Sequence, residues 1–289
     1  MTTAGSSLQI RRLAAFTDSP EGGNPAGVVV TDDALADSAM QAIAAEVGYS
    51  ETAFAFSPSQ DRRRWMIRYF SPVAEVSFCG HATVATGVVL GELVGPGGYA
   101  LETAGGLVAV EVGPGPEGRP MAALTSVAPS VESASGPLLE AALGHLRLEQ
   151  AQLDPRYSSA VSYAGARHLI LVLAERDTLA ALDYDFEGLR ALMESEDLTT
   201  VALLWRETPR RFHARNAFPV GGVVEDPATG AAAAAFGAYL RAEGHIEPPA
   251  SIEIVQGEDM GRRSQLQVTI PPGSAGITVS GGVVPIASA

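Results

Sequence analysis

Three polar residues occupy positions where they could move a proton. In CGHAT (Cys79–Thr83), His81 stands just before an Ala-Thr step, and in EDPATG (Glu225–Gly230), Asp226 stands two residues before another. Glu51 opens the otherwise apolar run ETAFAF. A carboxylic acid that is partly buried at the start of a strand suits proton transfer, which general acid–base catalysis requires. Plainer roles remain open: a surface glutamate, a structural histidine and an ordinary helix-capping aspartate.

The two Ala-Thr steps each precede a run of small side chains that predicts a helix. We expect these helices to extend from Thr83 to about Leu93 and from Thr229 to about Gly244. A helix N-terminus exposes unpaired N–H groups and partial positive charge, so it can bind a carboxylate without a basic side chain. The alanine-rich composition after Gly230 is typical of a helix enclosed by sheet, where only small side chains fit.

The order of predicted elements is the same in both halves: strands, a helix, strands, the small-residue helix, and strands again. This order predicts an internal repeat with copies of about 130 residues, a usual domain size, although any α+β chain has some self-similarity. The Gly/Pro-rich stretch at 113–120 suggests that the halves join near residues 113–130. We therefore predict an N-terminal domain at 1–125, completed by the C-terminal strand at 276–289, and a C-terminal domain at 126–275.

Composition excludes several functions. The chain has 289 residues and a net charge of −14, and all 19 basic residues are arginine. Without lysine there is no Schiff base, no attachment of pyridoxal phosphate and no Walker-type phosphate loop. The acidic balance argues against nucleic acid and anionic membranes as partners.

Cysteine and histidine usage adds two expectations. Cys79 is the single cysteine, and no apolar run approaches the length of a membrane span, so we expect a cytoplasmic protein without disulfides. We expect no metal site, because the histidines show no paired ligand spacing. They are His81, His145, His168, His213 and His245.

Six stretches occur in order along the chain and resemble one family: FTDSPEGGNPAGVVV, SETAFAF, RYFSPVAEVSFCGHATVATGVVL, RHLILVL, EDPATGAAAAAFGAYL and QGEDMGRRS. Together, over about residues 16 to 284, they resemble the PhzF-type phenazine-biosynthesis family of the diaminopimelate-epimerase-like superfamily. The resemblance implies an α+β fold of two similar domains, each a curved, mostly antiparallel sheet wrapped around a central helix, with the active site in the interdomain cleft. It also implies a homodimer and a cofactor-independent isomerase that moves a proton on a small cyclic carboxylate.

The resemblance also implies roles for individual residues. Glu51 is the catalytic acid and base, assisted by His81 and Asp226. The substrate-binding positions are Asn24, Gly80, Gly230 and Ala231. We expect backbone N–H groups around Gly80 and Gly230 to hold the substrate carboxylate.

Two positions depart from the family pattern. Ala231 stands where the family motif DPATGS has serine, and Arg263 stands where GRPS has proline. The first change removes a hydroxyl from the expected site and puts the phenazine-pathway substrate in doubt. An epimerase with two catalytic cysteines is excluded, because Cys79 is alone and a small core thiol is its simplest role. The remaining alternative is a catalytically lapsed binding protein that retains the fold.

Overall fold

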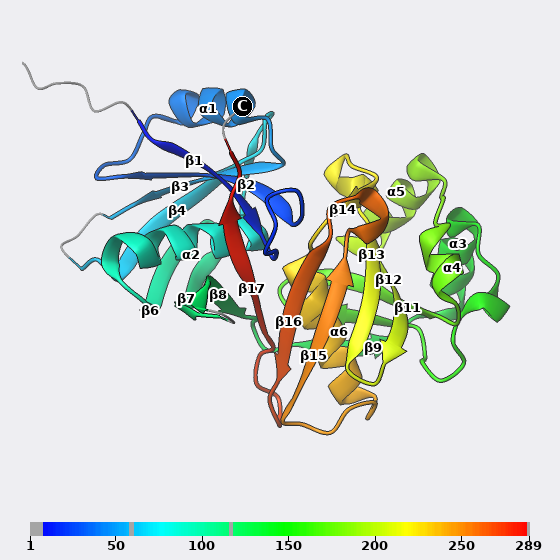
Figure 1. Ribbon diagram of the computed structural model, residues 1–289. Coiled ribbons are helices and arrows are strands. Elements are labelled where there is room, and N and C mark those ends of the chain that lie inside the picture. Colours follow the sequence, from blue (N-terminus) through cyan, green and yellow to red (C-terminus); the bar gives the residue numbers. More distant parts are fainter. Residues whose placement is uncertain (1–7, 58–60, 116–117, 288–289) are drawn as a thin grey trace, which may run out of the picture. The chain divides into compact units, whose positions relative to one another are not determined.

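The computed structural model describes residues 8–57, 61–115 and 118–287, and the chain divides into two compact units (Figure 1). The first unit comprises residues 1–21, 25–124 and 281–289, and the second comprises residues 22–24 and 125–280. Both units therefore combine segments from distant parts of the sequence. None of the helices in the described ranges is long and apolar enough to cross a membrane.

Within its described residues, the first unit has two α-helices and a mixed sheet. In chain order its elements are β1 (Ile10–Ala15), β2 (Asn24–Thr31), α1 (Asp37–Val47), β3 (Glu51–Phe56), β4 (Arg64–Phe70), β5 (Glu75–Val76), α2 (Gly80–Val94), β6 (Gly97–Thr103), β7 (Gly106–Pro114) and β8 (Pro120–Thr125). β2 pairs in parallel with β3, β3 pairs antiparallel with β4, β4 pairs in parallel with β6, and β6, β7 and β8 form an antiparallel run. The short β5 lies antiparallel on the end of β4.

The second unit repeats this arrangement. Its elements are β9 (Ser130–Ser133), α3 (Gly136–Leu146), β10 (Ala160–Tyr163), β11 (Arg167–Leu173), α4 (Arg176–Ala180), α5 (Phe186–Ser195), β12 (Thr200–Thr208), β13 (Arg211–Ala217), β14 (Glu225–Asp226), α6 (Gly230–Ala242), β15 (Ala250–Gln256), β16 (Ser264–Ile270) and the start of β17 (Thr278–Pro285). The part of β17 from Gly281 onward belongs to the first unit. β11, β12, β13, β15, β16 and β17 pair with the same directions as β2, β3, β4, β6, β7 and β8, and the short β14 lies on β13. The identical pairing pattern confirms the predicted internal repeat, in which α2 corresponds to α6.

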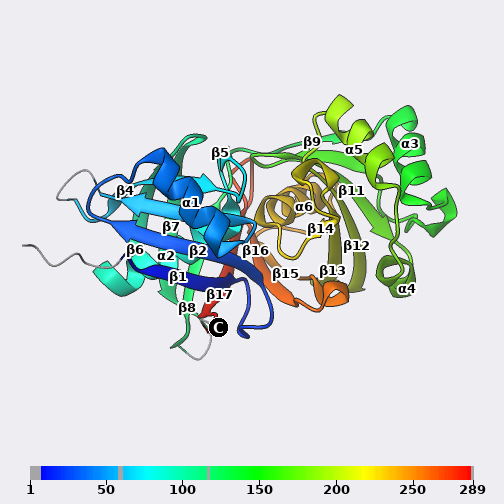
Figure 2. The ribbon, with the colours of Figure 1, turned by 90° about the horizontal axis from the view of Figure 1, so that it is seen from above.

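Each sheet packs against one helix whose middle is buried on all sides. In α2 the ten consecutive residues from His81 to Leu90 are buried, and the helix packs against β1, β3 and β7. In α6 the nine consecutive residues from Ala232 to Leu240 are buried, and β9, β10, β11 and β16 lie around the helix (Figure 2). Both helices are therefore shielded from water by strands, as the small-residue composition predicts.

The close approach of strand to helix explains the glycines. A Cβ atom added to Gly87 of α2 would lie 2.7 Å from Val110 Cγ1, and one added to Gly91 would lie 2.6 Å from Val112 Cγ1. In α6, a Cβ atom on Gly237 would lie 2.9 Å from Val268 Cγ1. Larger residues would push β7 or β16 away from the helix, because the core is already densely packed.

Other helices cover the opposite face of each sheet. In the first unit, Met40 and Ala44 of α1 pack on Phe54 and Phe70, whose rings meet edge to face. In the second unit, α3, α4 and α5 pack on β11 and β12 in one larger apolar cluster. Because side chains alternate along a strand, Glu51 shares a face of β3 with Ala53 and Ala55, opposite to Phe54. Glu51 therefore lies on the face of β3 away from α1.

One local prediction differs from the structure. α2 begins at Gly80 rather than at Thr83, because the Thr83 hydroxyl donates to the Cys79 carbonyl (2.6 Å) from inside the first turn. The Gly/Pro-rich stretch connects β7 with β8, where Pro114 faces Pro120, and residues 116–117 within it lie outside the described residues. The chain passes from the first unit to the second after Leu124, within the range 113–130 expected for the junction.

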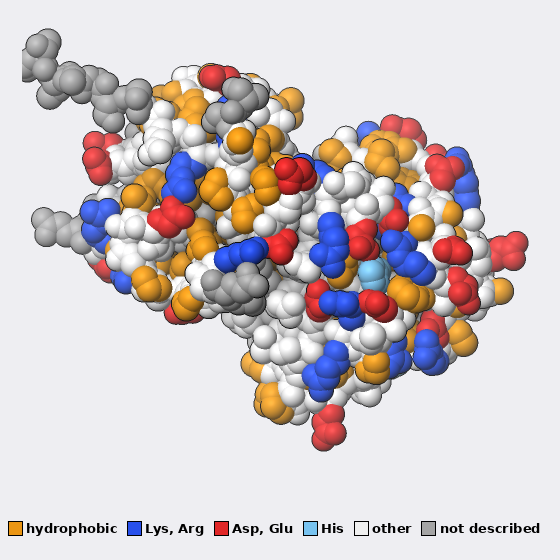
Figure 3. Space-filling model, viewed as in Figure 1, with side chains coloured by type: hydrophobic (Ala, Val, Ile, Leu, Met, Phe, Trp, Pro, Cys, Tyr) orange, Lys and Arg blue, Asp and Glu red, His pale blue; other side chains and the backbone are white. Residues whose placement is uncertain are grey.

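Surface charge on the second unit is mixed. In the view of Figure 3 its acidic and basic side chains lie side by side, whereas hydrophobic side chains gather on the face of the first unit. The second unit contains ion pairs such as Arg211 with Glu253 (2.8 Å) and Arg176 with Asp259 (3.0 Å). On this face the arginines therefore do not form a single basic patch.

Two glycine substitutions test the tight packing of the central helices. Gly87→Ala inserts a methyl group against β7 and should lower the free energy of unfolding by about 1–3 kcal/mol. Gly144→Ala, in α3, meets nothing within 4 Å and should raise it by about 0.5–1 kcal/mol, because alanine has the higher helix propensity. Urea denaturation of both variants measures the two changes. Equal effects at the two positions would contradict the packing argument.

Candidate active site

In the first unit, the structure brings together Glu51 and the residues that begin α2. Glu51 Oε2 lies 3.4 Å from His81 Nε2 and 3.5 Å from Cys79 Sγ, and Cys79 Sγ lies 3.3 Å from His81 Nδ1. His81 is 6% exposed, and the Glu51 side chain keeps 20% of its surface open to solvent. A carboxylate, an imidazole and a thiol therefore meet at a site that is largely shielded from water.

A buried hydrogen-bond chain fixes the start of α2. The Thr83 hydroxyl uses its proton on the Cys79 carbonyl, so the Tyr69 hydroxyl donates to Thr83 over 2.6 Å. Burial raises the pKa of Tyr69, which keeps this donor protonated. Tyr69 also contacts the Phe78 ring edge to face. These contacts hold the backbone around Cys79 in one conformation and so position His81.

The first turn of α2 offers hydrogen-bond donors to a ligand. Cys79 is the N-cap residue and its side chain makes no capping hydrogen bond to the helix backbone, so it does not satisfy the first N–H groups, at Gly80 and His81. A Cβ atom on Gly80 would meet only the Phe78 ring, at 3.9 Å. The absence of a side chain at Gly80 thus leaves the backbone open to an anion.

The second unit holds a different polar cluster around Asp226. Asn24 Nδ2 donates to Asp226 Oδ1 and the Thr229 hydroxyl donates to Asp226 Oδ2, both over 2.7 Å. Gln256 Nε2 donates to the Asp226 carbonyl (2.6 Å) and to Thr229 Oγ1 (3.0 Å). Asn24 is 2% exposed and Gln256 1%. Neutral donors therefore help to fix the orientation of the carboxylate.

Asp226 does not cap α6. Thr229 is the N-cap residue and makes no side-chain bond to the helix, while Asp226 belongs to β14, three residues earlier. The helix begins with Gly230 and Ala231, and the Thr229 side chain does not hydrogen-bond to the free N–H groups of this first turn. The capping alternative for Asp226 is wrong.

The strand registers also correct the match between the two motifs. Tyr69 pairs with Val76 in the first unit, and Asn216 pairs with Asp226 in the second. Both central helices begin four residues after that pair, at Gly80 and Gly230. Asp226 therefore corresponds to Val76, and His81 corresponds to Ala231. Matching Thr83 with Thr229 placed the two motifs one helical turn out of register.

Sequence reasoning missed two participants. Gln256 stands at the end of β15 in a strand that reads as apolar, and its contacts with Asp226 appear only when β15 pairs with β13. Cys79 was interpreted as a core thiol, yet its sulfur contacts both Glu51 and His81. The helix-mouth position of Cys79 was the available signal, since a thiolate is favoured there.

The expectation of no metal site rested on histidine spacing, which does not detect this cluster. The donor atoms of Glu51, Cys79 and His81 all lie within 4.8 Å of one another, which is close enough to share a cation. Histidine spacing along the chain could not reveal this set, because its third member, Glu51, comes from β3.

His168 is completely buried in the second unit, and desolvation lowers its pKa to about 3.

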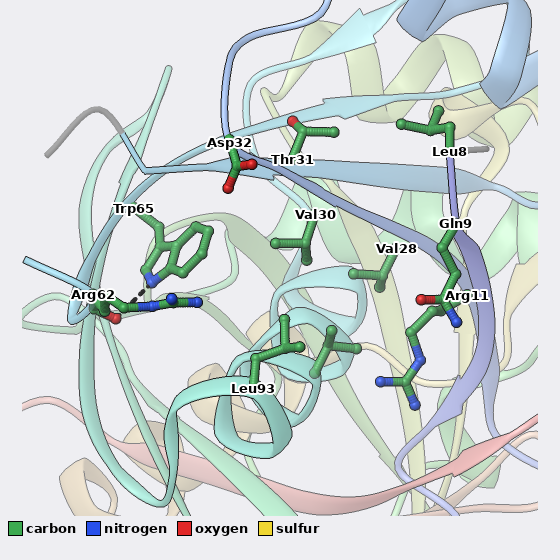
Figure 4. A pocket seen from close by; sticks show the side chains of 11 residues that line it. Leu8, Gln9, Arg11, Val28, Val30, Thr31, Asp32, Arg62, Trp65 and Leu93 are labelled. Atoms are coloured by element: carbon green, nitrogen blue, oxygen red, sulfur yellow. Dashed lines mark hydrogen bonds between the residues drawn. The ribbon is translucent and has the colours of Figure 1, made fainter. Parts of the chain in front are cut away.

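A separate pocket of about 530 Å³ lies along the C-terminal half of α2 in the first unit (Figure 4). Trp65, Val28 and Leu93 line it, and Arg11 and Arg62 flank it. The Trp65 indole donates to the Arg62 carbonyl (2.9 Å), and Arg11 is paired with Glu92. The described lining includes none of the predicted site residues and one carboxylate, Asp32, so this pocket is not the candidate active site.

Comparison with known proteins identifies the family. Residues 13–289 match the family PhzC-PhzF, phenazine biosynthesis-like protein. The chain belongs to the PhzC-PhzF family. This PhzF-family chain is 33% identical over 259 residues to a trans-2,3-dihydro-3-hydroxyanthranilate isomerase of Pseudomonas chlororaphis, covering 87% of this chain and 86% of the relative. It is 30% identical to an uncharacterised isomerase of Bacillus subtilis, covering 90% and 89%.

Solved structures agree with this assignment. A PhzF-family protein of Bacillus anthracis superposes with a TM-score of 0.85 at 25% identity, covering 97% of each chain. A probable proline racemase of Agrobacterium radiobacter, with a TM-score of 0.65 and 13% identity, covers 96% of this chain and 91% of its own and shares the fold alone. The chain therefore has the PhzF and epimerase-like fold, and it is an isomerase whose natural substrate is unknown.

The Asn24–Asp226 contact makes a prediction about stability and pH. Asn24→Asp replaces the donor with a second carboxylate, and two carboxylates at this distance cannot both ionise. Because the folded variant retains a proton that the unfolded chain releases, its stability should fall as pH rises above about 4, by up to about 1.4 kcal/mol per pH unit.

Asn24→Ala is the matched control. It loses the hydrogen bond at a cost of about 1–3 kcal/mol, without adding a charge. Urea denaturation of both variants at pH 5 and pH 8, each relative to the unsubstituted chain, gives the comparison. If the two variants lose the same stability between these pH values, the close contact between Asn24 and Asp226 is disproved.

Proposed function

We propose that this chain is a cofactor-independent isomerase that moves a proton on a small cyclic carboxylate, with Glu51 as the acid and base. The observation that carries the proposal is the position of Glu51, whose carboxylate is largely shielded and 3.4 Å from the His81 imidazole, beside the open N-terminus of α2. Two relatives, from Pseudomonas chlororaphis and Pseudomonas fluorescens, are named trans-2,3-dihydro-3-hydroxyanthranilate isomerases, and the substrate in that name is a small cyclic carboxylate.

The proposed reaction uses two properties of this site. The N–H groups of Gly80 and His81 bind the substrate carboxylate, and the helix dipole favours the negative charge that develops when Glu51 removes a proton from carbon. Glu51 then returns the proton to another carbon of the conjugated system. The His81 imidazole, within reach of the Glu51 carboxylate, stabilises whichever protonation state the step produces.

Asp226 acts in the same proposed reaction. Its carboxylate is oriented by Asn24 and Thr229, so that it can serve as a fixed charge or a proton carrier. Residues that act as a unit show strongly non-additive kinetics. In a double-mutant cycle, Glu51→Gln combined with Asp226→Asn should cost little more than the worse single variant. Fully additive losses would assign Asp226 a separate role.

Glu51→Gln is the decisive variant, because it preserves shape and removes the proton carrier. Turnover should fall at least about a hundredfold, with substrate binding largely retained. Exchange of solvent deuterium into a panel of cyclic carboxylates, followed by mass spectrometry, measures the reaction without knowledge of the natural substrate. Glu46→Gln, on the exposed side of α1, is the control and should leave the exchange rate unchanged.

Two results would count against this assignment. Retained exchange in Glu51→Gln would transfer the role of base to His81 or Asp226. Binding of a carboxylate by calorimetry, with no exchange into any member of the panel, would favour the catalytically lapsed binding protein. Ala231 is the observation that keeps this second candidate open.

Ala231 bears on the choice of substrate. It is the second residue of α6, where the family pattern has serine, and it is partly buried. Without the hydroxyl, the chain favours a substrate that needs no hydrogen bond at this position. We expect little or no conversion of trans-2,3-dihydro-3-hydroxyanthranilate by the unsubstituted chain.

Ala231→Ser should raise any trace of this conversion by about threefold to tenfold, the value of one hydrogen bond of 0.5–1.5 kcal/mol. Ala231→Cys is the control, because cysteine has nearly the same shape as serine but its thiol is a much weaker hydrogen-bond donor than the serine hydroxyl. Spectrophotometric assays of kcat/KM for the three proteins give the comparison. Conversion by the unsubstituted chain at a typical enzymatic rate, about 1–10³ s⁻¹, would show that the alanine is neutral.

A further inference from the structure

Among the contacts of Glu51, Cys79 and His81, the one between nitrogen and oxygen is long for a hydrogen bond. Glu51 Oε2 lies 3.4 Å from His81 Nε2 and 3.5 Å from Cys79 Sγ, and Cys79 Sγ lies 3.7 Å from His81 Nε2. Protein hydrogen bonds between nitrogen and oxygen are usually about 2.7–3.2 Å long. Three side chains of different chemistry thus converge, and their donor atoms lie within 4.8 Å of one another although the nitrogen and oxygen are too far apart for a strong hydrogen bond.

The same distances match the edges of a tetrahedral zinc site. With Zn–S near 2.3 Å and Zn–N and Zn–O near 2.0 Å, tetrahedral angles place sulfur about 3.5 Å from nitrogen and from oxygen, and nitrogen about 3.3 Å from oxygen. The three observed distances differ from these values by about 0.2 Å or less. Cys79 Sγ also lies 3.3 Å from His81 Nδ1, so it is not in the direction of the Nε2 lone pair. Rotation of the His81 ring about its side-chain bonds, without a change in the backbone, would let a zinc ion bind all three donors.

We propose that Glu51, Cys79 and His81 form a binding site for Zn²⁺ and that the bound ion blocks the isomerase. Thiolate and imidazole favour Zn²⁺ over Mg²⁺ and Ca²⁺, which prefer oxygen ligands. The form of Cys79 that binds metal is the thiolate. Binding releases the thiol proton, so affinity rises with pH.

The site has three protein ligands, which leaves a fourth position for water or a substrate oxygen. Ser50 Oγ lies 3.4 Å from His81 Nε2, close enough to donate a hydrogen bond to a water molecule bound there. The blocking effect rests on the proposed function: a carboxylate lone pair that is bound to zinc cannot accept a proton from carbon. Zinc binding itself does not depend on that function.

Cobalt substitution tests the site directly. The full-length protein, reduced and freed of metal, is titrated with Co²⁺ and followed by absorption spectroscopy. We expect one equivalent to bind, with intense visible bands of tetrahedral Co²⁺ and a near-ultraviolet band from thiolate-to-cobalt charge transfer, and we expect Zn²⁺ to displace it. A spectrum without thiolate character at one equivalent would overturn the proposal.

Variants locate the ion. Cys79→Ser should abolish the charge-transfer band, and Glu51→Gln and His81→Gln should each weaken Co²⁺ binding at least about tenfold. His213→Gln is the matched control, because His213 lies 2.6 Å from Glu258 and 3.1 Å from Glu207 in a second histidine–carboxylate cluster. Binding that survives Cys79→Ser and is lost in His213→Gln would place the ion elsewhere and disprove the assignment.

Inhibition is measured separately. Zn²⁺ should stop deuterium exchange at the concentration that saturates the cobalt-competition signal, and Cys79→Ser should be less inhibited relative to its own rate without zinc. Zinc binding without inhibition would overturn the blocking step. If no carboxylate exchanges in any condition, the proposed function fails, while the cobalt spectrum still decides whether the metal site exists.

Discussion

The close packing of a sheet around a central helix is the constraint on which the rest of the structure depends. Val110 and Val112 of β7 approach α2 so closely that Gly87 and Gly91 cannot carry a Cβ atom without a shift. A helix held in this way cannot rotate or slide, so its first turn is fixed relative to β3. The packing of Gly87 and Gly91 against β7 therefore helps to hold His81 beside Glu51, although neither glycine belongs to the site.

This arrangement can attract an anion through helix N-termini instead of through a lysine or arginine side chain. The side chains of the N-cap residues of α2 and α6, Cys79 and Thr229, make no capping hydrogen bond to the helix backbone, so they do not satisfy the first N–H groups. Because the helices are buried, their dipoles act where water screens them poorly. A chain in which every basic residue is arginine can therefore offer an anion fixed backbone donors in place of a flexible cation.

The sequence predicted what depends on composition and local order. The alanine-rich run correctly indicated an enclosed helix, and six ordered motifs indicated the family. Prediction failed where hydroxyl or amide groups had a choice of partners. The Thr83 hydroxyl bonds inside the helix instead of capping it, and Asn24 finds Asp226 202 residues away. No local pattern encodes such pairings, because they arise only when strands from distant parts of the chain meet.

One strand has a consequence for how the chain is made. Within β17, Thr278–Ser280 pairs with β16 of the second unit, whereas Val283–Pro285 pairs with β1 of the first. During synthesis, β1 of the first unit must wait for residues 283–285 to leave the ribosome, although most of that unit emerges before residue 125. The second unit likewise needs Gly22–Asn24, held by Arg262, from the beginning of the chain. Neither unit can therefore be excised as one continuous segment and keep its full set of contacts. During synthesis, the first unit gains its last strand pairing only after residues 283–285 have been made.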